Sequence, residues 1–263
     1  MKTPAQEVTE DSPSETDSEP PGNLLVKISP HLKSLAKKFP EIKRQFYPSA
    51  EENKSSKRCF VDPLIEEDYL KTKGLYHKYP KRVLILLTLA CASYCRFCTR
   101  KRRISELKEA QLNNKDIDNI VNYLKKYPEV NEVIFSGGDP FMSPKELIEA
   151  IKKISRLAQI KIIRIHTRVP ISAPELVKKN LIDSLRKIKE KTLYISLHFE
   201  HPAELTPSIF LMAWEFNQIL WLLAQRSLLT KEGWKDWPFF AMLSQVIFFL
   251  LRIWIVFIKF RFS

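Results

Sequence analysis

The sequence predicts an α/β fold in which parallel strands alternate with helices, and three observations support that prediction. First, residues 83–88 form a continuous apolar run, which is typical of a strand buried on both faces. Second, similar runs recur along the chain, with segments of helical apolar spacing between them. Third, polar and metal-binding side chains follow the end of each run, where ligand sites lie in α/β folds. This alternation favours a parallel sheet or barrel.

The individual elements follow from local patterns between residues 82 and 200. A first helix is predicted around residues 117–124, because apolar residues recur there at i, i+3, i+4 and i+7. Residues 143–146 resemble a capping box with proline at the first helical position, which opens a second helix. Residues 172–175 resemble another capping box, and the helix that it opens is expected to reach about residue 189. Strands are predicted at residues 83–88, 132–136, 161–166 and 192–198.

The parts outside this core differ from it in composition. The amino-terminal part is acidic and rich in Ser, Thr and Pro, so little of it can be buried. The next part has short apolar clusters, and a short helix is expected near residues 30–38, stopped by Pro40. The predicted organisation is a disordered acidic tail (1–23), a lead-in segment (24–77), the α/β core (78–208) and an apolar helical tail (209–263).

The formal net charge of +13 is compatible with more than one class of partner. A basic balance often indicates nucleic acid or an acidic surface. The lysines are scattered along amphipathic segments, however, which favours solvated helix faces. An RNA-binding module, suggested by clusters of Tyr, Phe and Arg, remains as an alternative. No apolar secretory signal is visible near the amino terminus, so a cytoplasmic location is expected.

Three cysteines that follow the first predicted strand indicate metal chemistry. They are Cys91, Cys95 and Cys98, and a basic run at residues 99–103 comes directly after them. A structural zinc site normally needs four ligands in two pairs, and the fourth cysteine, Cys59, lies far upstream. Three thiolates instead leave one metal position open, which suits a cluster that binds a further ligand. The alternative is that the cysteines are small core residues or part of a zinc knuckle.

The cysteine pattern resembles that of the radical S-adenosylmethionine (SAM) superfamily. Phe97 precedes the third cysteine, and residues 136–139, Ser-Gly-Gly-Asp, follow the second predicted strand. This turn is similar to the one that receives the methionine amine in the superfamily, where glycine permits a close backbone approach. The resemblance implies a 4Fe–4S cluster, SAM at the open iron, and a partial (β/α) barrel with about four recognisable βα units.

Further segments resemble the lysine 2,3-aminomutase family, over roughly residues 60–208. The matching segments are residues 79–88, 95–102, 136–140, 164–170 and 196–202. The resemblance implies an isomerase that interconverts L-lysine and β-lysine by migration of an amino group, assisted by pyridoxal 5′-phosphate (PLP). A sister family that acts on glutamate is the alternative, because the acidic residues that select the substrate side chain fall outside the matching part.

The same resemblance implies roles for individual residues. Arg100 is expected to pair with the substrate carboxylate, a task that suits a planar bidentate donor. His198 is expected to contact a cofactor at the end of the fourth strand. The remaining implied ligands are Cys91, Cys95 and Cys98 for the cluster, Phe97, Ser136, Gly137, Gly138 and Asp139 for SAM, and Tyr79 and Arg82 near PLP.

The resemblance also implies the partners. The substrate is expected to be a free amino acid, and the electron donor a flavodoxin or a ferredoxin. A homo-oligomer is compatible with the resemblance, whereas no nucleic-acid partner is expected.

The resemblance ends abruptly after about residue 208. All five tryptophans of the chain lie beyond this point, and Lys231 and Lys235 do not lie in the context of the family's Schiff-base lysine. We therefore predict that residues 209–263 are an out-of-frame or replaced tail. The barrel would then be incomplete and the chain inactive or weakly active. The alternative is a membrane anchor, since the apolar residues 238–258 are long enough to span a bilayer.

Overall fold

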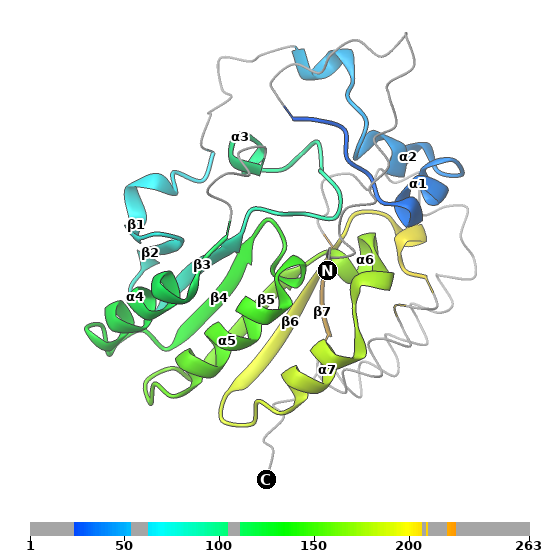
Figure 1. Cartoon of the computed structure of the whole chain (residues 1–263). Coiled ribbons are helices and arrows are strands. Elements are labelled where there is room, and N and C mark those ends of the chain that lie inside the picture. The colour runs from blue at the N-terminus through cyan, green and yellow to red at the C-terminus, as the bar shows by residue number, and fades with distance from the viewer. Residues whose placement is uncertain (1–23, 54–62, 105–110, 207–208, 210–219, 225–263) are drawn as a thin grey trace.

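The computed structural model of the protein describes residues 24–53, 63–104, 111–206, 209 and 220–224. Within these residues the chain forms one sheet of seven strands, which lie side by side in chain order (Figure 1). The strands are β1 (Leu70–Thr72), β2 (Leu75–Tyr79), β3 (Arg82–Thr88), β4 (Glu132–Gly137), β5 (Ile162–Thr167), β6 (Thr192–Phe199) and β7 (Leu220–Ala224). The helices are α1 (Pro30–Ala36), α2 (Pro40–Arg44), α3 (Lys101–Ile104), α4 (Asn114–Lys125), α5 (Pro144–Ser155), α6 (Val169–Ser172) and α7 (Lys179–Arg186). Short 3-10 turns are η1 (Ala50–Asn53), η2 (Glu67–Tyr69), η4 (Pro140–Met142), η5 (Pro174–Leu176) and η6 (Pro202–Glu204).

The parallel part of the sheet matches the predicted α/β fold. The four predicted strands correspond to β3, β4, β5 and β6, and each pairs in parallel with the next. Crossover connections bring the carboxyl ends of such strands to one edge of the sheet. The loop with the three cysteines, the Gly-Gly-Asp turn and His198 consequently lie at that edge. The described strands form an open sheet, as expected for a partial barrel.

The sheet is extended at both sides beyond the predicted strands. Strands β1 and β2 form an antiparallel hairpin beside β3, where the sequence predicted only an irregular lead-in. On the other side, β7 pairs in parallel with β6, and Leu220 lies opposite Ile195. The sequence predicted a helical tail here, because periodicity alone does not distinguish a short apolar strand from a buried helix. Ile209 is also buried in the core.

The two faces of the sheet have different chemistry. Helices α4, α5 and α7 cover one face (Figure 1), and the strands direct apolar side chains such as Phe135 and Ile165 into the core beneath them. Side chains alternate between the faces of a strand. The opposite face of β4, β5 and β6 therefore carries the intervening residues, several of which are polar: Ser136, Arg164, His166, Ser196 and His198. This polar face ends at the edge that holds the cysteine loop.

Two helix starts differ from the predicted capping boxes. Helix α5 begins at Pro144 as predicted, but the Ser143 side chain makes no capping hydrogen bond. Ser172 instead ends the short helix α6, and Ala173 then leaves helical geometry, so α7 begins only at Lys179. A capping box that the sequence reading missed lies at the start of α4, where Asn113 and Asp116 bond reciprocally.

The lead-in segment covers the cysteine loop. Helix α1 is confirmed, although Pro40 begins the next helix, α2, rather than only ending the first. Both helices lie above the carboxyl edge of the parallel strands (Figure 1). The amides of Tyr94 and Arg96 in the cysteine loop donate to the carbonyls of Lys27 and Gln45, at 2.8 Å each. The loop is thus hydrogen-bonded to the lead-in as well as to the sheet.

Three predicted features fall outside the described residues. They are the acidic tail (1–23), the apolar stretch 238–258 and Cys59. In the part of the chain that the structure describes, no helix is both long and apolar enough to cross a membrane.

Candidate active site

The three cysteines are free thiols on the loop that leaves β3. Cys91 and Cys98 pack against a small apolar cluster formed by Leu24, Tyr94 and Ile104. Burial raises the pKa of Cys91 well above its ordinary value, and the nearby Asp139 charge raises it further. Burial also raises the pKa values of Cys95 and Cys98. The thiols are therefore protonated at neutral pH, and a metal that binds them displaces their protons.

The surroundings of the thiols fit an iron–sulfur cluster. The charge of Lys27 acts on Cys91, the Nη1 atom of Arg168 donates to Cys95 Sγ at 2.9 Å, and a backbone hydrogen bond from Arg100 acts on Cys98. Three thiolates with positive partners suit an anionic cluster. Among the described residues, no three His, Cys, Asp or Glu side chains converge on a single ion position. A cluster does not need such convergence, because each thiolate binds a different iron.

The Gly-Gly-Asp turn clamps the start of the cysteine loop. The amide of Gly138 donates to the Thr88 carbonyl at 2.6 Å, and that of Asp139 donates to the Ala90 carbonyl at 2.8 Å. Gly137 has a φ of 129°, and a Cβ on either glycine would overlap backbone atoms of residues 88–90. Glycine is required here because the turn approaches the chain's own loop. The predicted close approach of these glycines to a ligand stays a prediction.

Asp139 uses its side chain within the protein. Its Oδ1 accepts from Thr167 Oγ1 at 2.6 Å and from the Phe141 amide at 3.0 Å. Its Oδ2 accepts from the amides of Arg168 at 2.6 Å and Val169 at 3.0 Å. Burial raises the pKa of this carboxyl, and the four donors oppose that rise. The side chain thus ties the end of β4 to the end of β5, and a contact with SAM would have to come from the backbone.

Arg100 lies at the expected edge but already has a carboxylate partner. Its Nε and Nη2 atoms donate to the two carboxylate oxygens of Glu66, at 2.8 and 2.5 Å. Its Nη1 lies 3.5 Å from Ser136 Oγ, so the arginine also reaches the turn after β4. Glu66 follows Ile65, whose φ of 51° is unusual for a β-branched residue. The carboxylate-binding geometry predicted for Arg100 is therefore present, with Glu66 as the anion.

The basic run after the cysteines is paired with acids of the lead-in. Glu52 accepts from Arg96 and from Lys101 Nζ, the latter at 2.9 Å, and Glu67 accepts from Arg102 at 2.5 Å. These pairs hold the lead-in to the cysteine loop. They also use charge that a nucleic-acid site would need to keep accessible, so they favour the structural interpretation of this run.

Phe97 and His198 meet although a hundred residues separate them. Their rings contact edge to face, with centroids 5.8 Å apart. His198 Nε2 also lies 2.5 Å from Glu200 Oε1. Burial lowers the pKa of His198 to about 4, helped by the Arg168 charge. Burial raises the pKa of Glu200 to about 7. Near neutral pH the imidazole is consequently neutral, and the carboxyl is close to its titration midpoint.

The polar face beside these rings has hydrogen-bonding atoms left over. His166 Nε2, Ser196 Oγ and Glu200 Oε2 are buried and have no hydrogen-bond partner among the described residues. His166 and Ser196 lie opposite each other on β5 and β6. Buried polar atoms normally find a partner. The donors and acceptors at this edge therefore fit a polar ligand such as SAM.

The structure does not bring every predicted residue to this edge. Arg82 is at the amino end of β3, where its Nε lies 3.5 Å from Glu132, and its guanidinium lies over the exposed ring of Tyr79. The seven residues of β3 separate this end from the cysteine loop by roughly 20 Å. The expected PLP contacts thus lie apart from the expected cluster and SAM contacts.

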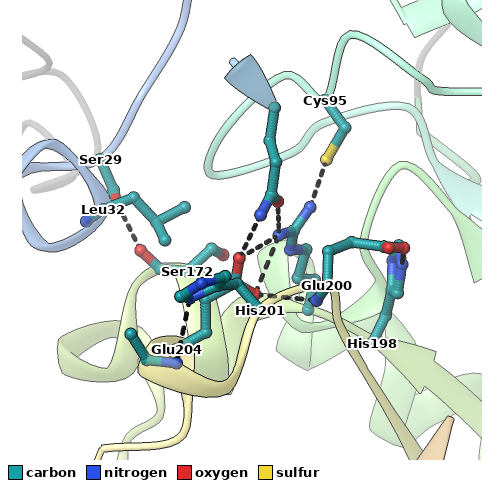
Figure 2. A network of polar contacts seen from close by, with 11 residues as sticks. Ser29, Leu32, Cys95, Ser172, His198, Glu200, His201 and Glu204 are labelled. Atoms are coloured by element: carbon teal, nitrogen blue, oxygen red, sulfur yellow. Dashed lines mark hydrogen bonds and ion pairs between the residues drawn. The ribbon is translucent and has the colours of Figure 1, made fainter. Parts of the chain in front are cut away.

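Sequence reasoning missed a buried polar network below Cys95. It contains Arg168, Gln45 and Glu204, and Figure 2 shows Glu204 and Cys95 linked through it, with Glu200 and His198 alongside. Arg168 lay in a matching segment at the end of the third predicted strand, which was one available signal. Gln45 and Glu204 carried no signal, because only the fold brings them to Arg168 from 123 and 36 residues away.

The comparisons with known proteins agree with this geometry. Residues 85–212 match the model of the radical SAM superfamily. The L-lysine 2,3-aminomutase of Fusobacterium nucleatum is 36% identical over 167 residues, which are 63% of this chain and 39% of that protein. The enzyme of the same name from Clostridium subterminale is 34% identical over 166 residues, again 63% and 39%. That from Methanococcus maripaludis is 37% identical over 146 residues, 55% and 33%.

The chain spans about two fifths of the length of these curated relatives or less. The matched region nevertheless includes the loop with the three cysteines, the Gly-Gly-Asp turn and the ends of β5 and β6. Residues 85–212 are therefore similar to the radical SAM superfamily, and the chain resembles the lysine 2,3-aminomutase family within it.

Proposed function

We propose that this chain provides the radical SAM core of an aminomutase that interconverts L-lysine and β-lysine. The observation that supports the proposal most is the convergence at one edge of the sheet. The three thiols, the turn at residues 136–139, Arg100 and the Phe97–His198 pair all lie there, although they come from distant parts of the sequence. The similarity to proteins named L-lysine 2,3-aminomutase supports this choice of substrate and reaction.

Each group of residues has a distinct task in this proposal. Cys91, Cys95 and Cys98 would hold the 4Fe–4S cluster, which together with SAM supplies a 5′-deoxyadenosyl radical when both are bound. Residues 136–139 and Phe97 would orient SAM, and the unpartnered polar atoms of β5 and β6 would accept its polar groups. Arg100 would bind the substrate carboxylate once its guanidinium has separated from Glu66. Cys91 and Cys98 pack against an apolar cluster and are only partly exposed.

The residues described do not assemble a site for PLP. Tyr79 is 57% exposed, and Arg82 contacts Glu132 at the opposite end of β3 from the cysteines. The participation of PLP remains a proposal that depends on the resemblance.

The first test measures the cluster. The full chain is reconstituted with iron and sulfide without oxygen, beside a Cys95→Ala variant. We expect about four iron and four sulfide per wild-type chain, since that is the content of a 4Fe–4S cluster, and much less in the variant. Equal iron in both proteins would contradict the proposal.

The second test measures the reaction. The reconstituted chain is incubated with SAM, PLP, a reductant and either L-lysine or L-glutamate, and the products are separated. We expect β-lysine from the lysine reaction, formed slowly because the described residues do not assemble a PLP site. Formation of β-glutamate only would favour the sister family, and a cluster-containing chain that releases neither product would limit its role to that of an inactive core. Repeating the assay with flavodoxin or ferredoxin as reductant identifies the electron donor.

A further inference from the structure

Arg168 has no role in the function proposed above, yet its side chain contacts a proposed cluster ligand. It follows directly after β5 and is 8% exposed. Its Nη1 donates to Cys95 Sγ at 2.9 Å. Among the described residues, Cys95 is the cysteine that receives a hydrogen bond from a charged side chain. Cys95 is thus the thiol that a positive side chain contacts directly, whereas the charges of Lys27 and Arg100 act on Cys91 and Cys98 without such a contact among the described residues.

The guanidinium is held in one position from several sides. Its Nη2 lies 3.1 Å from each carboxylate oxygen of Glu204, which is fully buried, and it also donates to Gln45 Oε1 at 2.5 Å. Gln45 in turn donates to Glu204 at 2.7 Å. Figure 2 shows that Glu204 and Cys95 lie on different sides of this network. The rings of Phe46 and Phe97 lie at 5.1 and 5.7 Å from the guanidinium carbon.

The location of the pair decides how strongly its charges act. A guanidinium keeps its proton at all relevant pH values, so Arg168 contributes a permanent positive charge. Charges interact more strongly in a buried site than in water. Arg168 touches the sulfur, whereas Glu204 contacts the guanidinium and not the sulfur, so the nearer positive charge dominates at Cys95. Glu204 reduces this effect without cancelling it.

We propose that the Arg168–Glu204 pair sets the reduction potential of the cluster through Cys95, with Arg168 raising it and Glu204 lowering it. The inference rests on the proposed cluster, because reduction adds one electron to that group. A hydrogen bond to a ligating sulfur and a nearby positive charge both stabilise the reduced, more negative form. Arg168 is thus a positioning residue that acts on the cluster through its ligand.

The test compares single variants of the full reconstituted chain. The reduction potential of the cluster is measured by a redox titration followed by electron paramagnetic resonance, in wild type, Arg168→Gln and Glu204→Gln. We expect Arg168→Gln to lower the ratio of reduced to oxidised cluster about tenfold at a fixed potential, which is a shift of 59 mV for one electron. We expect Glu204→Gln to shift the potential in the opposite direction, because it leaves the arginine charge uncompensated.

The opposite signs separate an electrostatic role from a merely structural one. If the network only supported the loop, both variants would lose iron, and the clusters that remained would have the wild-type potential; that result overturns the inference. If Arg168→Gln does not assemble a cluster, an Arg168→Lys variant replaces it in the comparison, because lysine keeps the positive charge. The reduction potential of Arg168→Lys should stay above that of any variant with a neutral residue at position 168. If the wild-type chain binds no cluster, the proposed function fails as well. If the wild-type chain binds the cluster but the reduction potentials of wild type, Arg168→Gln and Glu204→Gln are equal, only the present inference is overturned.

Discussion

Arg100 meets a carboxylate of its own chain where the proposed function needs a carboxylate of the substrate. Glu66 uses both of its oxygens for this contact, and both side chains are largely buried. Charge-assisted bidentate pairs are among the stronger hydrogen-bonded contacts. An incoming substrate therefore competes with Glu66 for the same two donor groups.

We expect Glu66→Gln to bind L-lysine more tightly than wild type. A neutral amide holds the guanidinium less strongly, and hydrogen bonds to charged groups contribute about 1.5–3 kcal/mol each. The dissociation constant should fall about tenfold, as measured by calorimetry on the reconstituted chain. Glu67→Gln is the matched control, because Glu67 pairs with Arg102 instead. Unchanged or weaker binding in Glu66→Gln would show that Glu66 does not compete.

The buried carboxyl of Glu200 predicts how the stability of the protein depends on pH. Its pKa in the folded protein is about 7, above its ordinary value, because burial disfavours the charged form. Folding therefore favours the protonated carboxyl, and stability is lost as the pH rises from the unfolded pKa, near 4.5, through 7. His198 acts in the opposite sense, since its lowered pKa removes stability as the pH falls from about 6.5 to 4.

We expect Glu200→Gln to be more stable than wild type at pH 8, with the difference disappearing near pH 4.5. The amide keeps a hydrogen-bond acceptor for His198 but carries no charge to bury. Urea unfolding at the two pH values measures the effect. Glu190→Gln is the control, because that carboxylate is exposed. A variant that is less stable than wild type at pH 8 would contradict the assigned pKa shift.

At the scale of elements, the turn after β4 and the loop after β3 form one unit. Two amides of the turn bond to carbonyls of the loop, and glycines at 137 and 138 allow the two backbones to touch. Asp139 then connects this unit to the end of β5. The position of Cys91, next to Ala90, thus depends on a turn about forty-five residues away in the sequence.

We expect Gly137→Ala to destabilise the chain by about 3 kcal/mol or more, since it combines a positive φ with a backbone clash. Thermal unfolding measures this loss, and iron content measures the effect on the cysteine loop. Ser136→Ala tests the neighbouring position, where the side chain lies 3.5 Å from Arg100 and no backbone clash arises. Similar losses in both variants would show that the glycine clamp is not the cause.

Sequence patterns predicted those elements whose signal is local. The apolar runs predicted β3 to β6, because the core buries these strands, and the helical spacing predicted α4, because one face of that helix is buried. The hairpin of β1 and β2 has a weak pattern, since Leu70 is exposed and β1 has three residues. The predicted helix start at residue 172 was wrong, because Ser172 belongs to the short helix α6 and is buried there.

The same distinction applies to the site. The cysteines, the turn and Arg100 were predicted, because each lies in a short motif with a recognisable spacing. Glu66 and Glu204 were not predicted, since their partners lie 34 and 36 residues away in sequence and only the folded chain brings them together. A pair of opposite charges at such a distance has many competing partners in a sequence with 43 basic residues.

At the scale of the whole molecule, the cysteine loop joins the lead-in to the sheet. Cys95 packs against the cluster formed by α1, α2 and Phe46, while Cys91 and Cys98 pack against the cluster that contains Leu24. Backbone hydrogen bonds from Tyr94 and Arg96 reach the same segment. A ligand that fixes the three thiols should therefore stabilise the lead-in as well as the loop.

We expect cluster assembly to slow amide hydrogen exchange in residues 24–47, and not only in the cysteine loop. The comparison is between the reconstituted chain and the same chain without iron, followed by mass spectrometry. Cys95→Ser, treated in the same way, should show little protection. Protection confined to residues 89–98 would mean that the lead-in and the loop open independently.

The contact between Glu66 and Arg100 has a consequence for how this site responds to its solution. Because one anion leaves as another arrives, substrate binding is an exchange that keeps the number of charges around the guanidinium constant. The affinity for L-lysine then depends on how much more strongly the substrate carboxylate binds Arg100 than Glu66 does. It does not depend on the full attraction between an anion and an arginine. Binding of L-lysine should accordingly change little with ionic strength, whereas the Glu66→Gln variant should lose affinity as salt is added.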